Sequence, residues 1–417
     1  MLCANISIGQ IVGKNVIIIG AGPAGLMAAQ KLAESGVNVT VYEKKKSPAR
    51  KFLLAGRGGL NLTHSEASPQ FTSRYRQAEE FMVPLIESFS PEDLRQWCRD
   101  LGEETFIGSS GRIFPTSFKA SPLLRAWLKR LETLCIKFEF QQEWMGWKNG
   151  KTVFKDQNGS LIEIASDATL LALGGASWPH LGSDGKWAQY MKEQKIEIAD
   201  FRPANSGFHV SWSDVFQKKF AGQALKNIAL HFQDKIISGE IMIDKNGVEG
   251  GAIYALSAEI REALAKQSPI TLTIDLKPSL SQQEILKKLL NRPRQRQSFS
   301  SYLERTLNLT PLALHLMREA DMTVQSFKPE DVAALVKALP VKLISPFGIE
   351  RSISTAGGIS LNEINEFMML HKIKSVFVAG EMLDWEAPTG GYLLQGCFSS
   401  AVKAAEGILC YLNSRDA

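Results

Sequence analysis

The sequence has little of what marks a membrane-bound, metal-binding or disulfide-stapled protein. Its five cysteines are scattered among 417 residues, without a CxxC pair or a Cys/His cluster at zinc spacing. This pattern predicts free thiols in a reducing compartment, and neither a disulfide framework nor a metal site. No apolar run reaches the roughly 18 residues of a membrane span, and no signal-peptide pattern opens the chain. We therefore expect a cytoplasmic protein.

A large excess of charge of one sign is also missing. The chain has 48 Lys and Arg against 43 Asp and Glu, a net charge of +5. So small an excess does not indicate a nucleic-acid partner, and we expect none. The hydrophobic content of 44% is that of an ordinary globular protein, and the length predicts two or three domains.

The strongest pattern that is present lies near the N-terminus. Asn15–Ile19 is a continuous apolar run, Pro23–Ser35 has a helical period, and Val37–Tyr42 returns to strand character. Two such strands joined by a helix predict a parallel sheet. Between the first strand and the helix stands Gly-Ala-Gly-Pro-Ala-Gly, residues 20–25, and Glu43 ends the second strand. Glycines at these positions allow a tight turn and close approach of a pyrophosphate, while a carboxylate at Glu43 can bind a ribose diol.

Two further segments favour FAD over NAD. Residues 50–64 form a loop rich in glycine and cations, able to wrap a pyrophosphate and reach a flavin. Residues 379–384 bring an acid pair from a strand, and Gly390-Gly391 then opens a helix whose N-terminus can stabilise a reduced flavin. The alternatives are a flexible surface loop for the first segment and buried C-cap glycines for the second.

The rest of the chain divides by pattern. We expect a long loop over residues 44–64, a meander of strands at 136–140, 144–148 and 152–155, and a buried strand at 168–173. Residues 206–276 have the short alternating segments of an antiparallel β region, and residues 281–338 are mostly helical. The first and last segments look like one domain with a long insertion.

Together with several further motifs, these segments make the chain resemble the BaiN/YhiN-type family of NAD(P)/FAD-dependent oxidoreductases. The motifs are GAGPAG, RKFLLAGRGGLNLTH, GRIFPTS, LALGGASWPHLGSDG, TAGGIS and AGEMLDWEAPTGGYLLQGC, in the family's order. The resemblance implies an α/β fold: a Rossmann-like, glutathione-reductase-like FAD domain interrupted by an antiparallel β-barrel-like domain and a small helical domain. The corresponding ranges are 1–205 with 346–417 for the FAD domain, 206–280 with 339–345 for the β domain, and 281–338 for the helical subdomain.

The resemblance also implies which residues line the FAD. By motif match these are Gly20, Gly22, Pro23, Ala24, Gly25, Glu43, Lys44, Lys51, Arg57, Gly58, Gly59, Asn61, Trp144, Ala172, Gly174, Gly175, Gly380, Glu381, Asp384, Gly391, Tyr392 and Gln395. Many members of the family carry Gly-Arg-Cys-Asn in the flavin loop. Here Leu60 replaces the cysteine, which excludes thiol chemistry at that point.

The catalytic residues are less clearly indicated. The candidates are His64, Arg112, His180 and Tyr392, although a structural histidine or a salt-bridged arginine fits the same patterns. The sequence predicts a flavoenzyme that transfers a hydride between flavin N5 and a small organic molecule, with NAD(P)H as transient donor. An oxidase of a small amine using O₂, or a non-enzymatic FAD-binding module, is the alternative.

Overall fold

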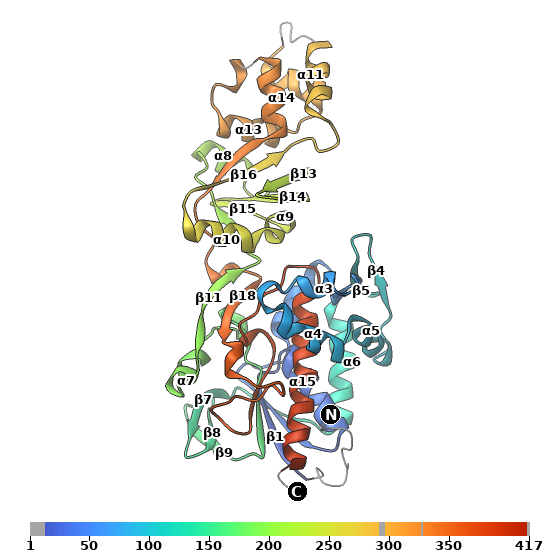
Figure 1. Ribbon diagram of the computed structural model, residues 1–417, viewed down its shortest axis with the longest axis vertical. Coiled ribbons are helices and arrows are strands. Elements are labelled where there is room, and N and C mark those ends of the chain that lie inside the picture. Colours follow the sequence, from blue (N-terminus) through green and yellow to red (C-terminus); the bar gives the residue numbers. More distant parts are fainter. Residues whose placement is uncertain (1–12, 292–296, 327, 415–417) are drawn as a thin grey trace. The chain divides into compact units, whose positions relative to one another are not determined.

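The computed structural model describes residues 13–291, 297–326 and 328–414 (Figure 1). Contacts divide the chain into two compact units. The first runs to Arg202 and resumes at Ser354, and the second is Pro203–Ile353. Within the described residues, no helix is both long enough and apolar enough to cross a membrane. The first unit is thus built from two distant segments, with the second inserted between them.

A five-stranded parallel sheet forms the centre of the first unit, in the order β19-β10-β1-β2-β6. Its strands are β1 (Asn15–Ile19), β2 (Asn38–Glu43), β6 (Lys137–Phe140), β10 (Ala168–Leu171) and β19 (Val376–Val378). Strands β1, β10 and β19 are almost fully buried, as expected of apolar strands covered on both faces. This parallel sheet confirms the predicted fold class.

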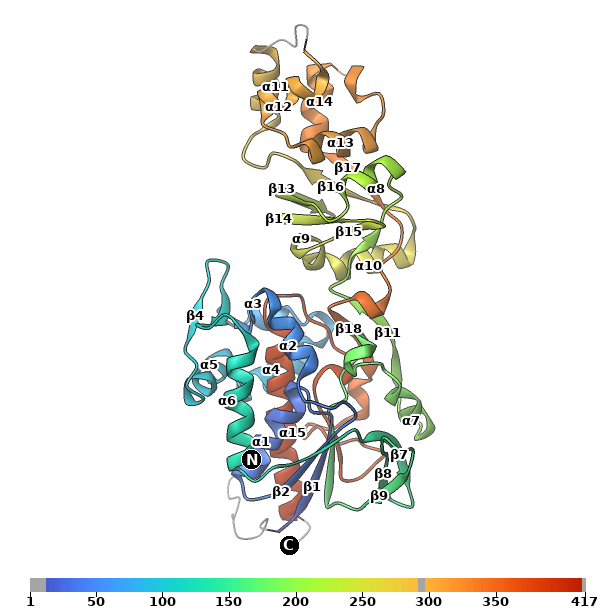
Figure 2. The same ribbon diagram turned by 180° about the vertical axis from the view of Figure 1, so that it is seen from behind.

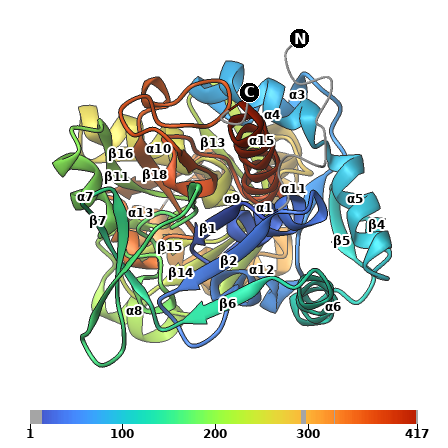
Figure 3. The same cartoon turned by 90° about the horizontal axis from the view of Figure 1, so that it is seen from below.

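Two helices lie side by side against this sheet (Figure 3). They are α1 (Pro23–Glu34) and α15 (Tyr392–Ser414). Gly25, Ala28 and Ala29 are buried on α1. Because none of them carries more than a methyl group, neighbouring elements can pack closely against this helix. Further along α1, the buried Gln30 accepts hydrogen bonds from the indole N–H groups of Trp97 and Trp127. The other long helices of this unit are α4 (Glu79–Ser88), α5 (Pro91–Asp100), α6 (Ala120–Thr133) and α7 (Trp187–Glu193).

The meander differs from the one that the sequence predicts. It consists of β7 (Glu143–Lys148), β8 (Lys151–Lys155) and β9 (Leu161–Ile164). Residues 136–140, expected as its first strand, instead give β6, which pairs in parallel with β2. A short alternating segment has the same sequence pattern in an antiparallel meander and at the edge of a parallel sheet. The strand with which it pairs, and not the alternation, determines the sheet to which it belongs. Tyr42 of β2 stacks on Phe154 of β8 at 4.1 Å between ring centroids, which joins the meander to the sheet.

Residues 44–64 are also more regular than the long loop that we expected. They contain α2 (Arg50–Ala55), the 3-10 turn η2 (Gly56–Gly58) and β3 (Thr63–His64). The many glycines of this segment favoured the prediction of a loop, although the segment contains a helix of under two turns. β3 joins β5 (Arg112–Pro115) and β4 (Thr105–Ile107) in a small antiparallel sheet, which we call the ribbon sheet.

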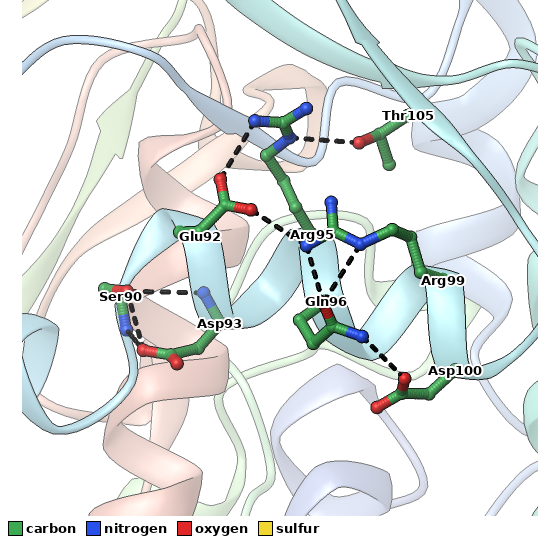
Figure 4. A network of polar contacts seen from close by, with 8 residues as sticks. All are labelled: Ser90, Glu92, Asp93, Arg95, Gln96, Arg99, Asp100 and Thr105. Carbon is green, nitrogen blue, oxygen red and sulfur yellow. Dashed lines mark hydrogen bonds and ion pairs between the residues drawn. The ribbon is translucent and has the colours of Figure 1, made fainter.

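A network of polar contacts on α5 holds the base of the ribbon sheet (Figure 4). Ser90 and Asp93 cap the helix reciprocally. Arg95 forms an ion pair with Glu92 at 2.9 Å and donates from Nε to Thr105 Oγ1 at 3.1 Å. Because Thr105 begins β4, this contact ties the strand to the helix.

The second unit is built on a six-stranded antiparallel sheet (Figure 2). In sheet order its strands are β12 (Phe208–His209), β15 (Gly247–Glu249), β14 (Lys235–Asp244), β13 (Ala224–Phe232), β16 (Ile270–Asp275) and β17 (Leu339–Leu343). The sheet curls until its edges meet: Ile344 donates its N–H to His209 O at 2.9 Å, and His209 donates to Ser345 O at 2.8 Å. This is the barrel-like sheet of the predicted fold.

The helices of the second unit share one hydrophobic core with its sheet. Leu272 of β16, Leu303 and Val336 are all fully buried in that core. The helices are α8 (Asp214–Phe220), α9 (Gly251–Ala255), α10 (Ser257–Lys266), α11 (Gln282–Asn291), α12 (Phe299–Leu307), α13 (Pro311–Ala320) and α14 (Pro329–Lys337).

Candidate functional site

The glycine turn between β1 and α1 leaves open space where a ligand would lie. Gly20 has a φ of 104°, and its N–H donates to Tyr42 O at 2.8 Å. A Cβ at Gly25 would lie 1.9 Å from Gly20 O, so helix and strand touch there. At Gly22, by contrast, an added Cβ would have no neighbouring atom within 4 Å. Gly22 also caps α1 without a side-chain hydrogen bond, which leaves the first N–H groups of the helix for an anion.

Glu43 closes one side of this turn. Its carboxylate accepts hydrogen bonds from Ala21 N at 3.0 Å and from Lys45 N at 2.8 Å. Burial raises the pKa of Glu43, while those two hydrogen bonds and the nearby lysines act in the opposite direction. The carboxylate is therefore fixed beside the glycine turn.

The turn opens into a cavity of about 350 Å³, lined entirely by the first unit. Twelve of the residues predicted for FAD line it: Gly20, Gly22, Pro23, Ala24, Glu43, Lys44, Lys51, Trp144, Ala172, Gly174, Gly380 and Glu381. The structure therefore brings together the first strand, the start of α2, the meander and the strand end after β19.

Within the part of the chain that the structure describes, three buried polar atoms in the cavity wall have no hydrogen-bond partner. They are Gln142 Oε1, Trp144 Nε1 and Ser183 Oγ. A buried polar atom without a partner costs free energy, so native proteins seldom keep one. These residues fit a polar ligand such as the adenosine part of a dinucleotide.

A partly buried ion pair belongs to the wall of the same cavity. Lys51 Nζ is 2.9 Å from Glu381 Oε2 and donates to Ser177 Oγ at 2.7 Å. Glu381 also accepts from Thr355 N at 3.0 Å, which fixes the carboxylate from its other side.

The thiol of Cys397 belongs to the same wall. Burial raises its pKa to about 12, so at neutral pH it is a protonated thiol and no nucleophile. Cys98, Cys135 and Cys397 are free, as expected, but the expectation is wrong for Cys410, which is disulfide-bonded.

A second group of predicted residues lies outside the cavity wall, where α15 begins. An added Cβ at Gly391 would lie 2.5 Å from Thr63 Cα, so the helix start packs directly on the backbone of β3. Among the described residues, Asn61 Oδ1 and Thr63 Oγ1, from the segment that Gly391 contacts, are buried without a hydrogen-bond partner. The other predicted residues outside the wall are Gly25, Gly58, Gly59, Gly175, Asp384, Tyr392 and Gln395, while the predicted side chain of Arg57 falls outside the described part of the structure.

Three of these residues have packing roles in the structure. An added Cβ at Gly175 would lie 2.4 Å from Thr355 Oγ1. The Gln395 side chain donates to Phe89 O at 2.7 Å, which pins α15 to the end of α4. Asp384 donates its backbone N–H to Ile359 O at 2.8 Å, and burial raises the pKa of its carboxyl.

The catalytic candidates separate into a cluster and an outlier. His64 and Arg112 are cross-strand neighbours in the ribbon sheet, and the His64 ring stacks on Tyr392 at 5.2 Å between centroids. His180 lies elsewhere, exposed on the 3-10 turn η4 (Pro179–Leu181). Both ring nitrogens of His64 are engaged: Nδ1 accepts from Glu66 N at 3.1 Å, so Nε2 carries the proton toward Ser110 O at 3.0 Å.

Two members of this cluster were missed by the sequence analysis. Tyr392 Oη donates to Glu66 Oε2 at 2.8 Å, and Glu66 also forms an ion pair with Arg74. The Arg74 guanidinium lies 5.9 Å from the centroid of the Tyr392 ring. Burial and the Glu66 carboxylate raise the pKa of Tyr392, so its hydroxyl stays protonated at neutral pH. Glu66 follows His64 by two residues, but no motif singles out Arg74.

The sequence of residues 14–407 matches the HI0933-like protein Rossmann domain. The chain belongs to this family. Two full-length relatives are named ribosomal RNA dihydrouridine synthase: one from Escherichia coli, 22% identical over 96% of this chain and 99% of the relative, and one from Haemophilus influenzae, 24% identical over 94% and 98%.

Solved structures place the family in a wider fold group. A 3-ketosteroid delta1-dehydrogenase from Sterolibacterium denitrificans has a TM-score of 0.51 at 12% identity, covering 95% of this chain and 99% of that one. An Sdh1 complex of Mycobacterium smegmatis has a TM-score of 0.50 at 14% identity, covering 96% and 68%. The HI0933-like chain therefore shares the fold of these enzymes, and the predictions of family and fold class are confirmed.

Proposed function

We propose that this HI0933-like protein binds FAD and passes a hydride from NAD(P)H to the unsaturated ring of a uracil in RNA. The observation that carries the FAD part is the cavity at the glycine turn, with Glu43 on one side and three unpartnered polar atoms in its wall. A dinucleotide would supply partners for all of these groups.

The chain's own residues would hold FAD in a defined order. Glu43 would accept hydrogen bonds from the adenosine ribose, and Gly22 with the first N–H groups of α1 would receive the pyrophosphate. Lys51 and Glu381 would lie further along, toward the start of α15. When bound, FAD supplies hydride chemistry at N5, accepting from NAD(P)H and giving to the substrate.

The substrate is inferred from the relatives. Both full-length relatives carry the name ribosomal RNA dihydrouridine synthase. Forming dihydrouridine adds one hydride and one proton across the double bond of the uracil ring; NAD(P)H supplies the hydride, and an acid or water supplies the proton. Tyr392 holds a proton at its Oη, and Glu66 and Arg74 fix that side chain.

This proposal departs from our expectation of no nucleic-acid partner, which came from the small net charge. Net charge governs unspecific attraction to phosphates, whereas unpaired RNA bases can also be bound by stacking and hydrogen bonds. The full-length relationship therefore outweighs the charge balance.

An anaerobic stopped-flow experiment tests the function. NADH or NADPH should bleach the flavin of the purified yellow protein, and a uridine-containing fragment of ribosomal RNA should then restore its colour. Mass spectrometry should find two added hydrogens on the RNA. Bleaching by an amine and re-oxidation by O₂ alone would support the oxidase alternative, and a flavin that no donor reduces would favour the binding module.

A glycine pair tests the FAD site itself. Gly22→Val adds a side chain in open space, so the apoprotein should fold normally while the pyrophosphate is blocked. We expect this variant to be colourless, with an unfolding temperature near that of the wild-type apoprotein. Gly25→Val should instead fail to fold, because its Cβ would overlap Gly20 O. A Gly22→Val protein that keeps its flavin contradicts the site.

A further inference from the structure

The ribbon sheet carries three stacked aromatic rings that the function described above does not use. Phe106 and Phe114 are 5.8 Å apart between ring centroids, and Phe118 lies 4.8 Å from Phe114 and 5.8 Å from Phe106. The planes differ by only 14° to 28°. Phe106 is 39% and Phe118 44% exposed, so this stack is not a core. Single exposed apolar side chains are common, but a stacked group of them marks an interaction surface.

These rings share one face of the sheet with the catalytic candidates. Phe106 pairs across strands with Phe114, and His64 with Arg112. Directly opposed residues lie on the same face, and so do residues two apart in one strand, such as Arg112 and Phe114. The face therefore runs from the exposed phenylalanines past Arg112 to His64, which stacks on Tyr392. Ile113 points to the other face and is 2% exposed, so that side holds the sheet to the core.

The aromatic face is held rigidly at both ends. Arg95 on α5 binds Thr105, the residue before Phe106 (Figure 4). At the other end, an added Cβ at Gly59 would lie 2.3 Å from the Phe118 ring, so this ring packs on the loop predicted to reach the flavin. A preformed surface loses less conformational entropy on binding than a mobile one.

We propose that this face binds unpaired bases of an RNA strand by stacking, which rests on the proposed function. Flat aromatic faces accept any base, and stacking is the usual way in which proteins hold single-stranded RNA. Arg112 on the face and Lys119 beside Phe118 supply positive charge for phosphates. Nearby acids are Glu103, whose carboxylate accepts from Ser117 N, and Glu104 at the start of the ribbon. The strand would lead its uridine toward Tyr392.

The test measures RNA binding by the FAD-loaded, full-length protein. A fluorescently labelled 12-nucleotide RNA of mixed sequence, single-stranded or annealed to its complement, is titrated and followed by anisotropy. Phe106→Ala should weaken binding of the single strand about tenfold, the loss typical of one stacked base. Phe106→Leu should lose as much, because it keeps apolar surface without a ring, whereas Phe106→Trp should bind as wild type.

The chain offers a matched control on the same strand. Ile107, the next residue, is 51% exposed on the opposite face, so Ile107→Ala removes similar apolar surface without touching the stack. We expect it to bind RNA as wild type. Flavin absorbance and unfolding temperature of every variant verify that the fold and the cofactor are retained.

Several outcomes would overturn the proposal. Equal RNA affinity of Phe106→Ala and Ile107→Ala would reject stacking on this face while leaving the proposed reaction intact. Loss of self-association in Phe106→Ala, with unchanged RNA affinity, would make the face a protein interface. If the wild-type protein binds no RNA, both the binding face and the RNA substrate are wrong. Flavin bleaching by NAD(P)H would still test the hydride transfer to FAD separately.

Discussion

In the proposed FAD site, recognition of the adenosine end depends on the carboxylate of Glu43. It accepts two backbone hydrogen bonds, yet burial raises its pKa. A raised folded pKa means that the contribution of this group to stability is fully present below the unfolded pKa and is lost as the pH rises through the folded pKa. Acidification should therefore relieve the buried charge of the apoprotein, and at the same time remove the acceptor that the ribose needs.

These opposed effects give a prediction for pH. As the pH falls from neutral to about 5, FAD should bind more weakly to the wild type, because the raised pKa of Glu43 lets its carboxylate protonate at a higher pH than an ordinary glutamate. Glu43→Gln should bind FAD weakly, with no such dependence on pH. Quenching of flavin fluorescence at each pH gives the dissociation constants. Glu143→Gln, at another glutamate of the cavity wall, should retain the wild-type dependence; if it loses that dependence too, Glu43 is not the group that titrates.

Individual residues were predictable where the backbone sets their place. Gly22 and Glu43 follow from the strand–turn–helix pattern. This pattern alone determines where a glycine in the turn and an acid at the end of the second strand lie relative to each other. The unpartnered state of Gln142 and Ser183 is a property of the folded chain, so no pattern could indicate it. Arg74 was missed for the same reason: only folding brings it to Glu66 and Tyr392.

Among the elements, the segment of residues 182–186 after β10, here called the strap, contributes to the wall of the cavity at the glycine turn. Gly182, Ser183, Asp184 and Lys186 line that cavity. Asp184 forms an ion pair with Lys44, the residue after Glu43, at 2.9 Å. The side chains of Lys44 and Asp184 are mostly buried, 22% and 17% exposed respectively, so water screens this pair less than a surface pair. The pair connects the strap to the end of β2 across the predicted FAD site.

Breaking this ion pair should speed the release of FAD. We expect Asp184→Asn and Lys44→Gln each to release FAD about three- to tenfold faster than wild type, the range expected for one partly buried pair. The double exchange Lys44→Glu with Asp184→Lys should restore most of the slow release, since it reverses both charges. Stopped-flow displacement of FAD measures these rates. Lys186→Gln is the control from the same strap; double-exchange rates as fast as those of the single variants would show that the two charges act independently.

The elements were predictable to different degrees. β1, α1 and β2 have clear local patterns, an apolar run, a helical period and a return to strand character, and they appear where the sequence predicts them. β6 was assigned to the wrong sheet, because its partner β2 lies about a hundred residues away and leaves no trace in the local alternation. The strand β18 (Ser354–Ile359) was not expected, since its two glycines lower strand propensity, although all six of its residues are buried.

At the scale of the molecule, the chain leaves and re-enters the first unit through adjacent strands. β11 (Ile198–Ala204) and β18 form a two-stranded sheet. Ser360 donates its N–H to Glu197 O at 3.0 Å, and Ile353 donates to Asn205 O at 3.3 Å. The residues at which the insertion begins and ends are therefore in contact. Strands β11 and β18 would still pair with each other in a chain that lacked the inserted residues.

This arrangement predicts that the insertion can be removed without loss of FAD. With residues 206–352 replaced by a short Gly-Ser linker, the first unit should fold and bind FAD within about threefold of the full chain, because every residue that lines the cavity belongs to it and a short loop costs little closure entropy. Flavin absorbance after gel filtration measures retention, and adding Gly22→Val to the shortened chain is the control. A soluble, folded but colourless product would mean that the second unit completes the FAD site. A yellow product that NAD(P)H still bleaches, but that no longer reduces RNA, would show that the second unit is needed to bind the RNA substrate.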